Sequence, residues 1–338
     1  MDPLQKVRIG KTKLYVPRLG LGGAGLAGLY QPADEGESKA TIKAALDKGV
    51  AYCDTAPLYG YGQSERFYGS VLKNYDRDSF AISTKVGKVV RSSDGAGTGS
   101  ALPSATTLSK KAGMPTGMTM SFEMSRDGTL RSIEDSLKRL QLDKLDICLI
   151  HDPDAYPTGP EEGYRLAVTE VYPTLAELRS QGVIKAVGAG MNQCEMLTRF
   201  AHDVEMDCFL LAGRHTLIDH SAVSELLPVC QEKGISIILG GPFNSGILAS
   251  DLKRGAKFNY RDASEEILNK ARAVKDVCDR FKVPMKAAAL QYVFRQPSVA
   301  TTVPGARTPA EFEENFQLIQ HPIPNELWDV MEEEELIP

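Results

Sequence analysis

Long apolar runs are absent from this 338-residue chain. Nowhere do about 18 consecutive apolar residues occur, which is the length that a membrane-spanning helix needs. The opening MDPLQKVRIG also lacks the apolar core of a secretory signal peptide. We therefore expect a cytoplasmic protein without a membrane partner.

A strong charge of either sign is missing as well. Lys and Arg number 39 against 44 Asp and Glu, which gives a formal net charge of −5. The chain has no large basic field of the kind that phosphate backbones require, so we expect no nucleic-acid partner. The sequence leaves the oligomeric state open.

Cysteine is sparse and scattered. No C-x-x-C pair occurs, which disfavours both a zinc site and a redox dithiol. We expect reduced, mostly buried thiols at Cys53, Cys148, Cys194, Cys208, Cys230 and Cys278.

Short apolar runs alternate with stretches of helical period along the whole chain. Strands are predicted at 18–22, 51–56, 80–85, 146–151, 184–189, 208–212, 236–240 and 299–304. A hairpin over 7–16 precedes them. Eight strand–helix units in about 300 residues predict an α/β fold, a single-domain (β/α)8 TIM barrel over residues 1–338, in preference to an open doubly wound sheet.

Two long segments interrupt the alternation. Lys88–Arg126 is rich in Gly and Met and has no steady period, and Gly241–Asp262 follows the seventh predicted strand. We expect both to be long loops at the C-terminal face of the barrel, where active sites of this architecture lie.

Gly20–Gly25 matches the dinucleotide-binding pattern G-x-G-x-x-G. In a Rossmann fold this motif opens a helix directly, with an acidic residue about 20 positions on. Here Gly28, Tyr30 and Pro32 come before any helical period begins. We predict a flexible loop above the first strand.

Polar residues stand where three predicted strands end, at Asp54, Lys85 and His151. A lone buried polar residue is more often structural. Three at equivalent strand ends converge on one cavity in a barrel, which favours a functional site.

Tyr59 follows Asp54 in a Pro/Gly-rich loop that can reach over this cavity. The residue types suit proton transfer at an alcohol or carbonyl. A cation about 4 Å from the phenol would lower its pKa by about 3 units from the usual 10, and Lys85 is expected to supply it. Asp54 would orient Lys85, and His151 would hydrogen-bond the reacting oxygen.

A metal site at His151, Asp152 and Asp154 is the alternative interpretation. The sequence has no second His-rich cluster, and Pro153 indicates a stiff turn. We therefore predict no metal.

Five segments carry a family resemblance: DTAPLYGYGQSE, STKVG, DGTLRSIEDSLKRLQLDKLDICLIHDPD, GGPFNSGIL and VPGARTPAEFEEN. Over nearly its entire length the chain resembles the aldo-keto reductases. HDPD and GGPFNSGILA are most similar to the branch that contains D-threo-aldose 1-dehydrogenase, L-fucose dehydrogenase and pyridoxal 4-dehydrogenase. The resemblance implies a (β/α)8 barrel that binds NADP or NAD in extended form at its C-terminal face.

The resemblance also implies roles for single residues. It assigns catalysis to Asp54, Tyr59, Lys85 and His151. Apart from the resemblance, we expect substrate contacts from the segments Leu29–Tyr30, Lys88–Arg126 and Asp152–Tyr164, with Tyr30, His151 and Asp152 as the predicted residues. Asn192 would bind the nicotinamide carboxamide, and a stretch beginning at Gly305 would bind the adenosine end. The implied coenzyme contacts are Gly23, Asn192, Gly241, Phe243, Asn244, Ser245, Gly246, Leu248, Gly305, Arg307, Glu311, Glu314 and Asn315.

Some positions depart from the family pattern. Ala212 stands where many members have Gln, and Gly240 where many stack an aromatic ring on the nicotinamide. Glu311 replaces an arginine common in NADP-preferring members, and its carboxylate would repel a 2′-phosphate. Arg307 nearby could restore phosphate binding, so the choice between NAD and NADP stays open.

These implications predict an NAD(P)-dependent oxidoreductase of carbohydrate metabolism. Its expected reaction is oxidation of the anomeric carbon of an aldose, of the L-fucose or D-threo-aldose type, to a lactone. A pyridoxal 4-dehydrogenase or a general aldehyde reductase on the same site is the enzymatic alternative. From another class, a barrel that binds the nucleotide as a sensor or regulatory subunit stays open, although the intact set of four residues favours turnover.

Overall fold

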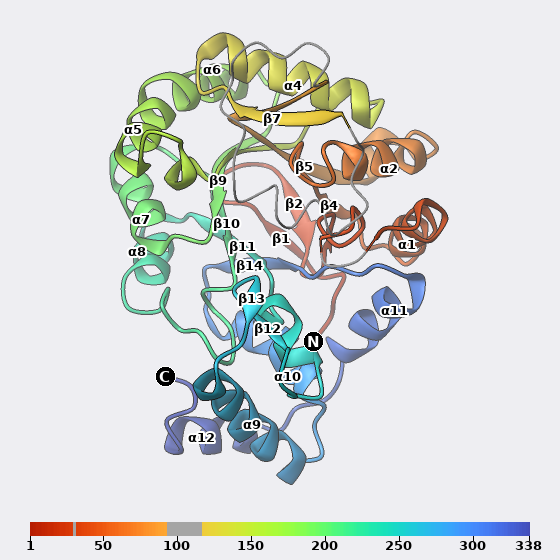
Figure 1. Cartoon of the computed structure of the whole chain (residues 1–338), viewed down its shortest axis with the longest axis vertical. Helices are drawn as coiled ribbons and strands as arrows, with labels where there is room; N and C mark the ends of the chain where they lie inside the picture. The colour runs from red at the N-terminus through yellow and green to blue at the C-terminus, as the bar shows by residue number, and fades with distance from the viewer. Residues whose placement is uncertain (30–31, 93–116) are drawn as a thin grey trace.

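Eight parallel strands form one sheet in the computed structural model, which describes residues 1–29, 32–92 and 117–338 (Figure 1). In order they are β3 (Leu21–Gly22), β4 (Tyr52–Asp54), β5 (Ala81–Val86), β8 (Ile147–His151), β9 (Ala186–Met191), β10 (Cys208–Ala212), β11 (Ser236–Gly240) and β14 (Val299–Val303). Parallel bridges from Leu19 to Thr302 and from Gly22 to Gly305 join the first strand to the last. The predicted barrel and its eight strands are confirmed.

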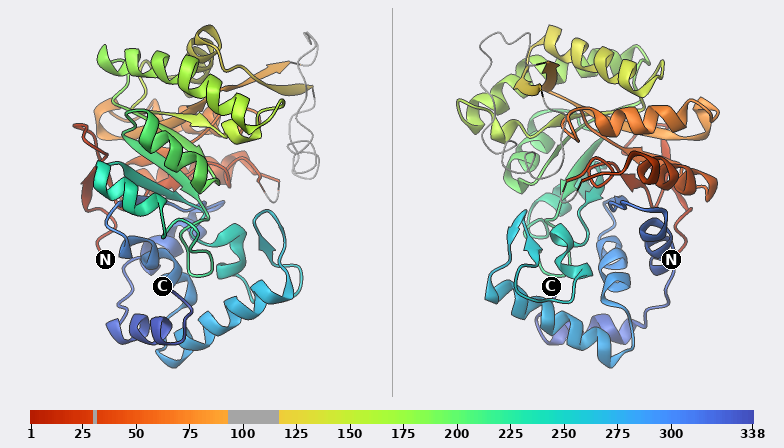
Figure 2. Two further views of the ribbon diagram at one scale, coloured as in Figure 1. Left: turned by 90° about the vertical axis from the view of Figure 1, so that its left-hand side faces the viewer. Right: turned by 45° about the vertical axis from the view of Figure 1, so that its right-hand side comes forward.

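Helices alternate with the strands and cover the outside of the barrel (Figures 1 and 2). They are α1 (Glu35–Asp47), α2 (Gln63–Leu72), α4 (Arg126–Leu140), α5 (Pro160–Leu166), α6 (Tyr172–Ser180), α7 (Cys194–Asp203), α8 (Leu226–Lys233), α9 (Glu265–Arg280), α10 (Met285–Tyr292), α11 (Pro309–Leu318) and α12 (Asn325–Glu333). Helices α9, α10 and α12 share a second apolar cluster that includes Trp328.

The alternation of side chains along each strand separates two parts of the core. One cluster joins Tyr52, Ala81 and Leu149 from neighbouring strands inside the barrel. Another joins their chain neighbours, such as Cys53 and Ile82, to the helices outside. Because residues two apart share a face, the end positions Asp54, Lys85 and His151 point toward the barrel interior at its C-terminal face.

The N-terminal hairpin closes the opposite mouth of the barrel. Strands β1 (Lys6–Arg8) and β2 (Tyr15–Pro17) pair antiparallel, as predicted. Ile9 and Val16 are fully buried in the interior cluster. Gly10, at the turn, donates its N–H to Ser236 Oγ at 2.8 Å, so the hairpin is fixed to a barrel strand.

The segment Lys88–Arg126 differs from the expected loop. Its ends form an antiparallel pair, β6 (Lys88–Ser92) with β7 (Met118–Phe122), and Arg126 already begins α4. The two strands have the sequences KVVRS and MTMSF. They are short and lie far apart in the chain, so the sequence does not show that they pair. Gly241–Asp262 contains a short 3-10 helix, Asn244–Ala249, and a small hairpin of β12 (Lys257–Phe258) and β13 (Arg261–Asp262).

The glycine-rich segment after the first strand is a loop, as predicted. Turns follow Gly22, and α1 begins only at Glu35, where the Asp34 side chain accepts from the Glu37 N–H. The segment therefore does not open a helix as a Rossmann motif does. Tyr30, a predicted substrate contact, lies outside the described residues.

Two further expectations concern the whole chain. All six cysteines are buried and free of disulfides, as predicted. Among the described residues, no helix combines the length and apolar character needed to cross a bilayer.

Gly10 tests how tightly the hairpin is fixed. Its φ of +54° and a built Cβ only 2.3 Å from Asp207 O mean that Gly10→Ala brings both backbone strain and a backbone clash. We expect a loss of at least about 2 kcal/mol in the free energy of unfolding, measured by urea denaturation. Gly182→Ala is the matched control, because Gly182 has φ +74° with nothing within 4 Å. Equal losses in the two variants would contradict the close approach.

Candidate active site

A buried ion pair forms the base of the cavity at the C-terminal face. Lys85 Nζ lies 3.0 and 2.9 Å from the two Asp54 carboxylate oxygens and donates to Thr55 O at 2.8 Å. Ser83, two residues before Lys85 on the same face of β5, donates to Asp54 Oδ1 at 2.7 Å. Three acceptors thus use the three N–H donors of the ammonium group, which fixes its position.

Tyr59 lies above this pair. The centre of its ring is 4.7 Å from Lys85 Nζ. The ring of His151 meets it edge-on, with centres 6.1 Å apart and planes at 90°. The loop that carries Tyr59 turns sharply, with positive φ at Gly60, Tyr61 and Gly62. The four residues predicted to act together are therefore brought together.

The pKa of Tyr59 is shifted in the direction opposite to the expected one. Burial raises the pKa of the phenol well above its ordinary value, and the Asp54 charge adds to the shift. The expectation that Lys85 lowers this pKa is wrong for the free chain. The physical reason is the burial of the phenol, to which the charge of the Asp54 carboxylate adds.

His151 is 5% exposed. Burial lowers its pKa well below the ordinary value, against the opposing charge of Asp152. The imidazole is therefore neutral at neutral pH and can hydrogen-bond a reacting oxygen without carrying charge. Its Nδ1 has no hydrogen-bond partner among the described residues.

A second ion pair borders His151. Lys88 Nζ donates to Asp152 Oδ2 at 2.6 Å, and the same oxygen lies 3.4 Å from His151 Nε2. Asp152 was predicted as a substrate contact, and Lys88 was named only as the first residue of a long loop expected to supply such contacts. A lysine at the first position of a predicted loop is expected to be solvent-exposed. Lys88 is only 3% exposed, and this burial, which the sequence does not show, places it at the site.

One cavity of about 460 Å³ extends from Asp54 and Tyr59 along the C-terminal ends of the strands. The predicted coenzyme contacts that line it are Gly23, Asn192, Gly241, Phe243, Asn244, Ser245, Gly246, Gly305, Arg307, Glu311, Glu314 and Asn315. Leu248 is fully buried in the second apolar cluster and is not among the lining residues. The cavity also has lining residues that were not predicted as contacts, among them Asn259, Tyr260 and Lys286.

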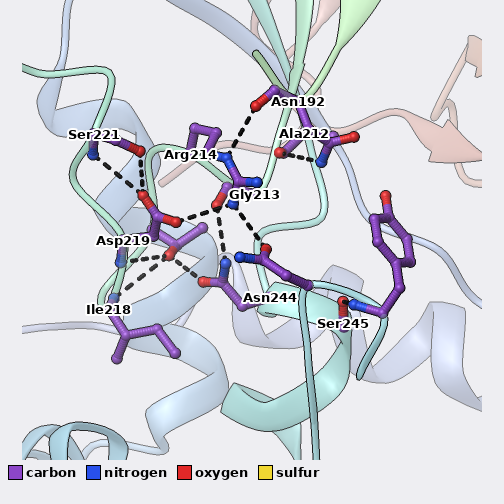
Figure 3. A network of polar contacts seen from close by, with 12 residues as sticks. Asn192, Ala212, Gly213, Arg214, Ile218, Asp219, Ser221, Asn244 and Ser245 are labelled. Atoms are coloured by element: carbon purple, nitrogen blue, oxygen red, sulfur yellow. Dashed lines mark hydrogen bonds and ion pairs between the residues drawn. The ribbon is translucent and has the colours of Figure 1, made fainter. Parts of the chain in front are cut away.

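The wall of the cavity after β9 and β10 is fixed by a polar network (Figure 3). Asn192 Nδ2 donates to Ala212 O at 2.7 Å, and Arg214 Nε donates to Asn192 O at 3.0 Å. Asn244 Nδ2 donates to Gly213 O at 3.0 Å. Arg214 also reaches Asn259 Oδ1 at 2.8 Å, which fixes the small hairpin β12–β13 beside the cavity.

The far end of the cavity lies at the start of α11. Thr308 caps this helix, accepting from the Glu311 N–H at 3.2 Å, as predicted. Arg307 donates to Glu311 Oε1 from Nη2 at 2.6 Å, and its backbone N–H reaches Oε2 at 2.8 Å. The two opposing charges that left the coenzyme choice open are therefore paired with each other.

The alternative metal site has no matching arrangement of ligands in the part of the chain that the structure describes. No group of three His, Cys, Asp or Glu side chains there could hold an ion. Asp152, one of the three ligands considered, is bound to Lys88 instead.

Comparisons with known proteins agree with this geometry. Residues 18–334 match the family model described as "Aldo/keto reductase family". The chain belongs to the aldo/keto reductase family. Members of the family are oxidoreductases that generally use nicotinamide coenzymes.

Two curated relatives and one solved structure show how the similarity is distributed. The chain is 35% identical over 338 residues to pyridoxal 4-dehydrogenase of Microbacterium luteolum, covering 98% of each. It is 33% identical over 326 residues to D-threo-aldose 1-dehydrogenase of Pseudomonas sp, covering 96% of each. An aldo-keto reductase of Bacillus halodurans, solved in its holo form, shares the fold with a TM-score of 0.75 at 23% identity, covering 99% of this chain and 97% of that one.

The raised pKa of Tyr59 can be measured in the chain without coenzyme. Phenolate absorbs in the near ultraviolet, so a pH titration of wild type minus Tyr59→Phe isolates the signal of Tyr59. We expect no phenolate signal from this residue below about pH 10, because burial favours the neutral phenol. A midpoint below pH 10 in the difference titration would show that Lys85 does lower the pKa.

Proposed function

We propose that this aldo/keto reductase oxidises the anomeric carbon of an aldose to a lactone, with a nicotinamide coenzyme. The observation that carries the proposal is the meeting of Tyr59, the Lys85–Asp54 pair and His151, of which Tyr59 and Asp54 line one end of a long cavity. The relationship to D-threo-aldose 1-dehydrogenase supports an aldose as the substrate.

The chemistry assigned to each residue follows from its surroundings. An aldose in its ring form is a hemiacetal, so the reacting carbon carries one hydroxyl and one hydrogen. Oxidation requires Tyr59 as its phenolate, after its own proton has passed to solvent, and the positive charge of a bound oxidised coenzyme would favour that form, which burial disfavours in the chain alone. The phenolate takes the hydroxyl proton while the hydrogen leaves the carbon as hydride to the coenzyme, and the C=O bond of the lactone forms. The bound coenzyme supplies the hydride acceptor and, in its oxidised form, a positive charge. Neutral His151 donates a hydrogen bond to the reacting oxygen and orients it.

The described residues fit an extended dinucleotide. The cavity is continuous from Tyr59 through Asn192 and the Gly241–Gly246 turn to the start of α11. Glycines supply much of its lining, so backbone can approach a ligand closely. We infer that Asn192 holds the carboxamide and that the N-terminus of α11 receives a phosphate or the adenosine ribose.

Pyridoxal is the second candidate substrate, and the 35% identity to pyridoxal 4-dehydrogenase favours it. Its aldehyde lies beside a hydroxymethyl group, so it can close to a cyclic hemiacetal and react in the same way. A sugar is distinguished from it by the hydroxyl on the carbon next to the reacting one.

Substitution of Tyr59 tests the proposed reaction. Wild type should reduce NAD or NADP with at least one aldose in a panel that includes pyridoxal, followed by absorbance of the reduced coenzyme. Tyr59→Phe should lower kcat by at least about a hundredfold, because it removes the group that moves the proton. Coenzyme affinity, measured by fluorescence titration, should change by less than about twofold, since the hydroxyl does not hold the nucleotide.

Tyr61→Phe is the matched control, because Tyr61 lies in the same loop but does not line the cavity. A Tyr59→Phe variant that kept a tenth of the wild-type kcat would exclude the phenol as the proton-transfer group. If the protein oxidised pyridoxal but none of the aldoses in the panel, pyridoxal would be the substrate instead.

Coenzyme preference should depend on the pair of Arg307 and Glu311. Because the Arg307 guanidinium is already paired with the Glu311 carboxylate, it is not free to bind a 2′-phosphate. We therefore propose that NAD is preferred over NADP. Glu311→Gln frees Arg307 for a 2′-phosphate and should raise the ratio of kcat/KM for NADP to that for NAD by about tenfold, or roughly 1.4 kcal/mol. Arg307→Ala should lower the same ratio.

The control for this pair is Glu313→Gln. Glu313 lies on the same helix, pairs with Lys48 at 2.9 Å and is not among the residues that line the cavity. If neither Glu311→Gln nor Arg307→Ala moves the ratio by about threefold while Glu313→Gln also leaves it unchanged, the adenosine end lies elsewhere in the cavity.

A further inference from the structure

The pair of Lys88 and Asp152 is not used by the proton-transfer groups. Lys88 is 3% exposed, and its ammonium donates to Asp152 Oδ2 at 2.6 Å. Burial of an ammonium group is unfavourable unless a charge compensates it, so the pair is a costly feature to place inside a barrel mouth. The fold provides it immediately beside the reacting position.

The position of the pair is set by two neighbouring strands. Lys88 follows Lys85 by three residues, where β5 passes into β6, and Asp152 directly follows His151 at the end of β8. Asp152 Oδ2 lies 3.4 Å from His151 Nε2. Its charge also acts on the phenol of Tyr59, which places the carboxylate within electrostatic reach of the proton-transfer group.

The backbone holds Asp152 in a special conformation. Its φ of 44° and ψ of 56° are left-handed, a region that Asp and Asn adopt more readily than most other side chains. The Asp152 N–H donates to Gly190 O on the adjacent strand at 3.1 Å. The turn therefore fixes the carboxylate at the strand end instead of leaving it on a mobile loop.

The two oxygens of the Asp152 carboxylate have different surroundings among the described residues. Lys88 and His151 both approach Oδ2, whereas no donor of residues 1–29, 32–92 and 117–338 hydrogen-bonds to Oδ1. The Asp152 side chain is 26% exposed. A fixed anionic acceptor beside an ammonium donor is what a hydroxyl group needs, because a hydroxyl both donates and accepts.

We propose that Lys88 and Asp152 bind the hydroxyl on the carbon next to the reacting carbon, and so select α-hydroxy carbonyl compounds and their hemiacetals. This inference rests on the proposed function, since it names the substrate class of the same site. Asp152 accepts from the hydroxyl, and Lys88 keeps the carboxylate charged and oriented. A substrate without the hydroxyl leaves the carboxylate without this partner and is disfavoured.

The test uses aldehydes that differ at one group. Wild type should reduce lactaldehyde with a kcat/KM at least about tenfold higher than that for propanal. 2-Methoxypropanal, which keeps the oxygen but cannot donate, should lose this advantage. Because these comparisons use the wild-type protein, they do not depend on whether any variant folds.

Two variants then assign the preference to the pair. Asp152→Asn and Lys88→Met should each reduce the ratio of kcat/KM for lactaldehyde to that for propanal to within about threefold of one. Asp154→Asn is the matched control, because Asp154 lies in the same turn without a hydrogen bond to Lys88. A structural role for the pair would lower both rates together and leave the ratio intact, which would overturn the inference.

The outcome also separates this inference from the proposed function. A lactaldehyde preference that depends on Asp152, in a protein that oxidises no aldose, would leave the inference standing and exclude the proposed reaction. Aldose oxidation without any preference for lactaldehyde over propanal would support the proposed function and overturn this inference. A wild-type protein that reduced neither aldehyde would overturn the inference.

Discussion

The ion pair between Lys85 and Asp54 is the constraint on which the site depends. Each residue sits at the last inward position of its strand, and a barrel brings these positions together at one mouth. Thr55 O and both carboxylate oxygens of Asp54 accept from the ammonium, and Ser83 in turn holds the Asp54 carboxylate. Tyr59 lies above the pair, with its ring centre 4.7 Å from Lys85 Nζ, and its burial together with the Asp54 charge raises the pKa of the phenol.

Much of the architecture could be predicted from residue pattern alone. The strands are short apolar runs in a regular rhythm, and a strand is readable when every position is buried, as in ICLIH over β8. Asp54, Lys85 and His151 were detectable because each is a polar residue where such a run ends. Thr308 and Pro309 likewise gave the start of α11 through the ordinary chemistry of a helix cap.

The rest depends on contacts that no local pattern encodes. Strands β6 and β7 pair across residues 93–116, so neither shows its partner in the sequence. Lys88 acquires its role from Asp152, 64 positions away. The direction of the Tyr59 pKa shift is set first by the burial of the phenol and then by the Asp54 charge, and neither can be read from the local sequence. The pairing of Arg307 with Glu311 was equally invisible, since two charges four residues apart on a helix start can also point apart.

The proposed coenzyme cavity lies across the seam of the barrel, where the first strand meets the last. β3 contains only two residues, and the first and last strands meet through two isolated bridges, Leu19–Thr302 and Gly22–Gly305. Gly22 and Gly305 also line the cavity, from opposite sides of the seam. A ligand bound there would contact both the first and the last strand–loop junction. Its binding free energy would therefore stabilise the closed barrel. Release of that ligand and local opening of the seam would then be thermodynamically linked, because the same two glycines belong to both.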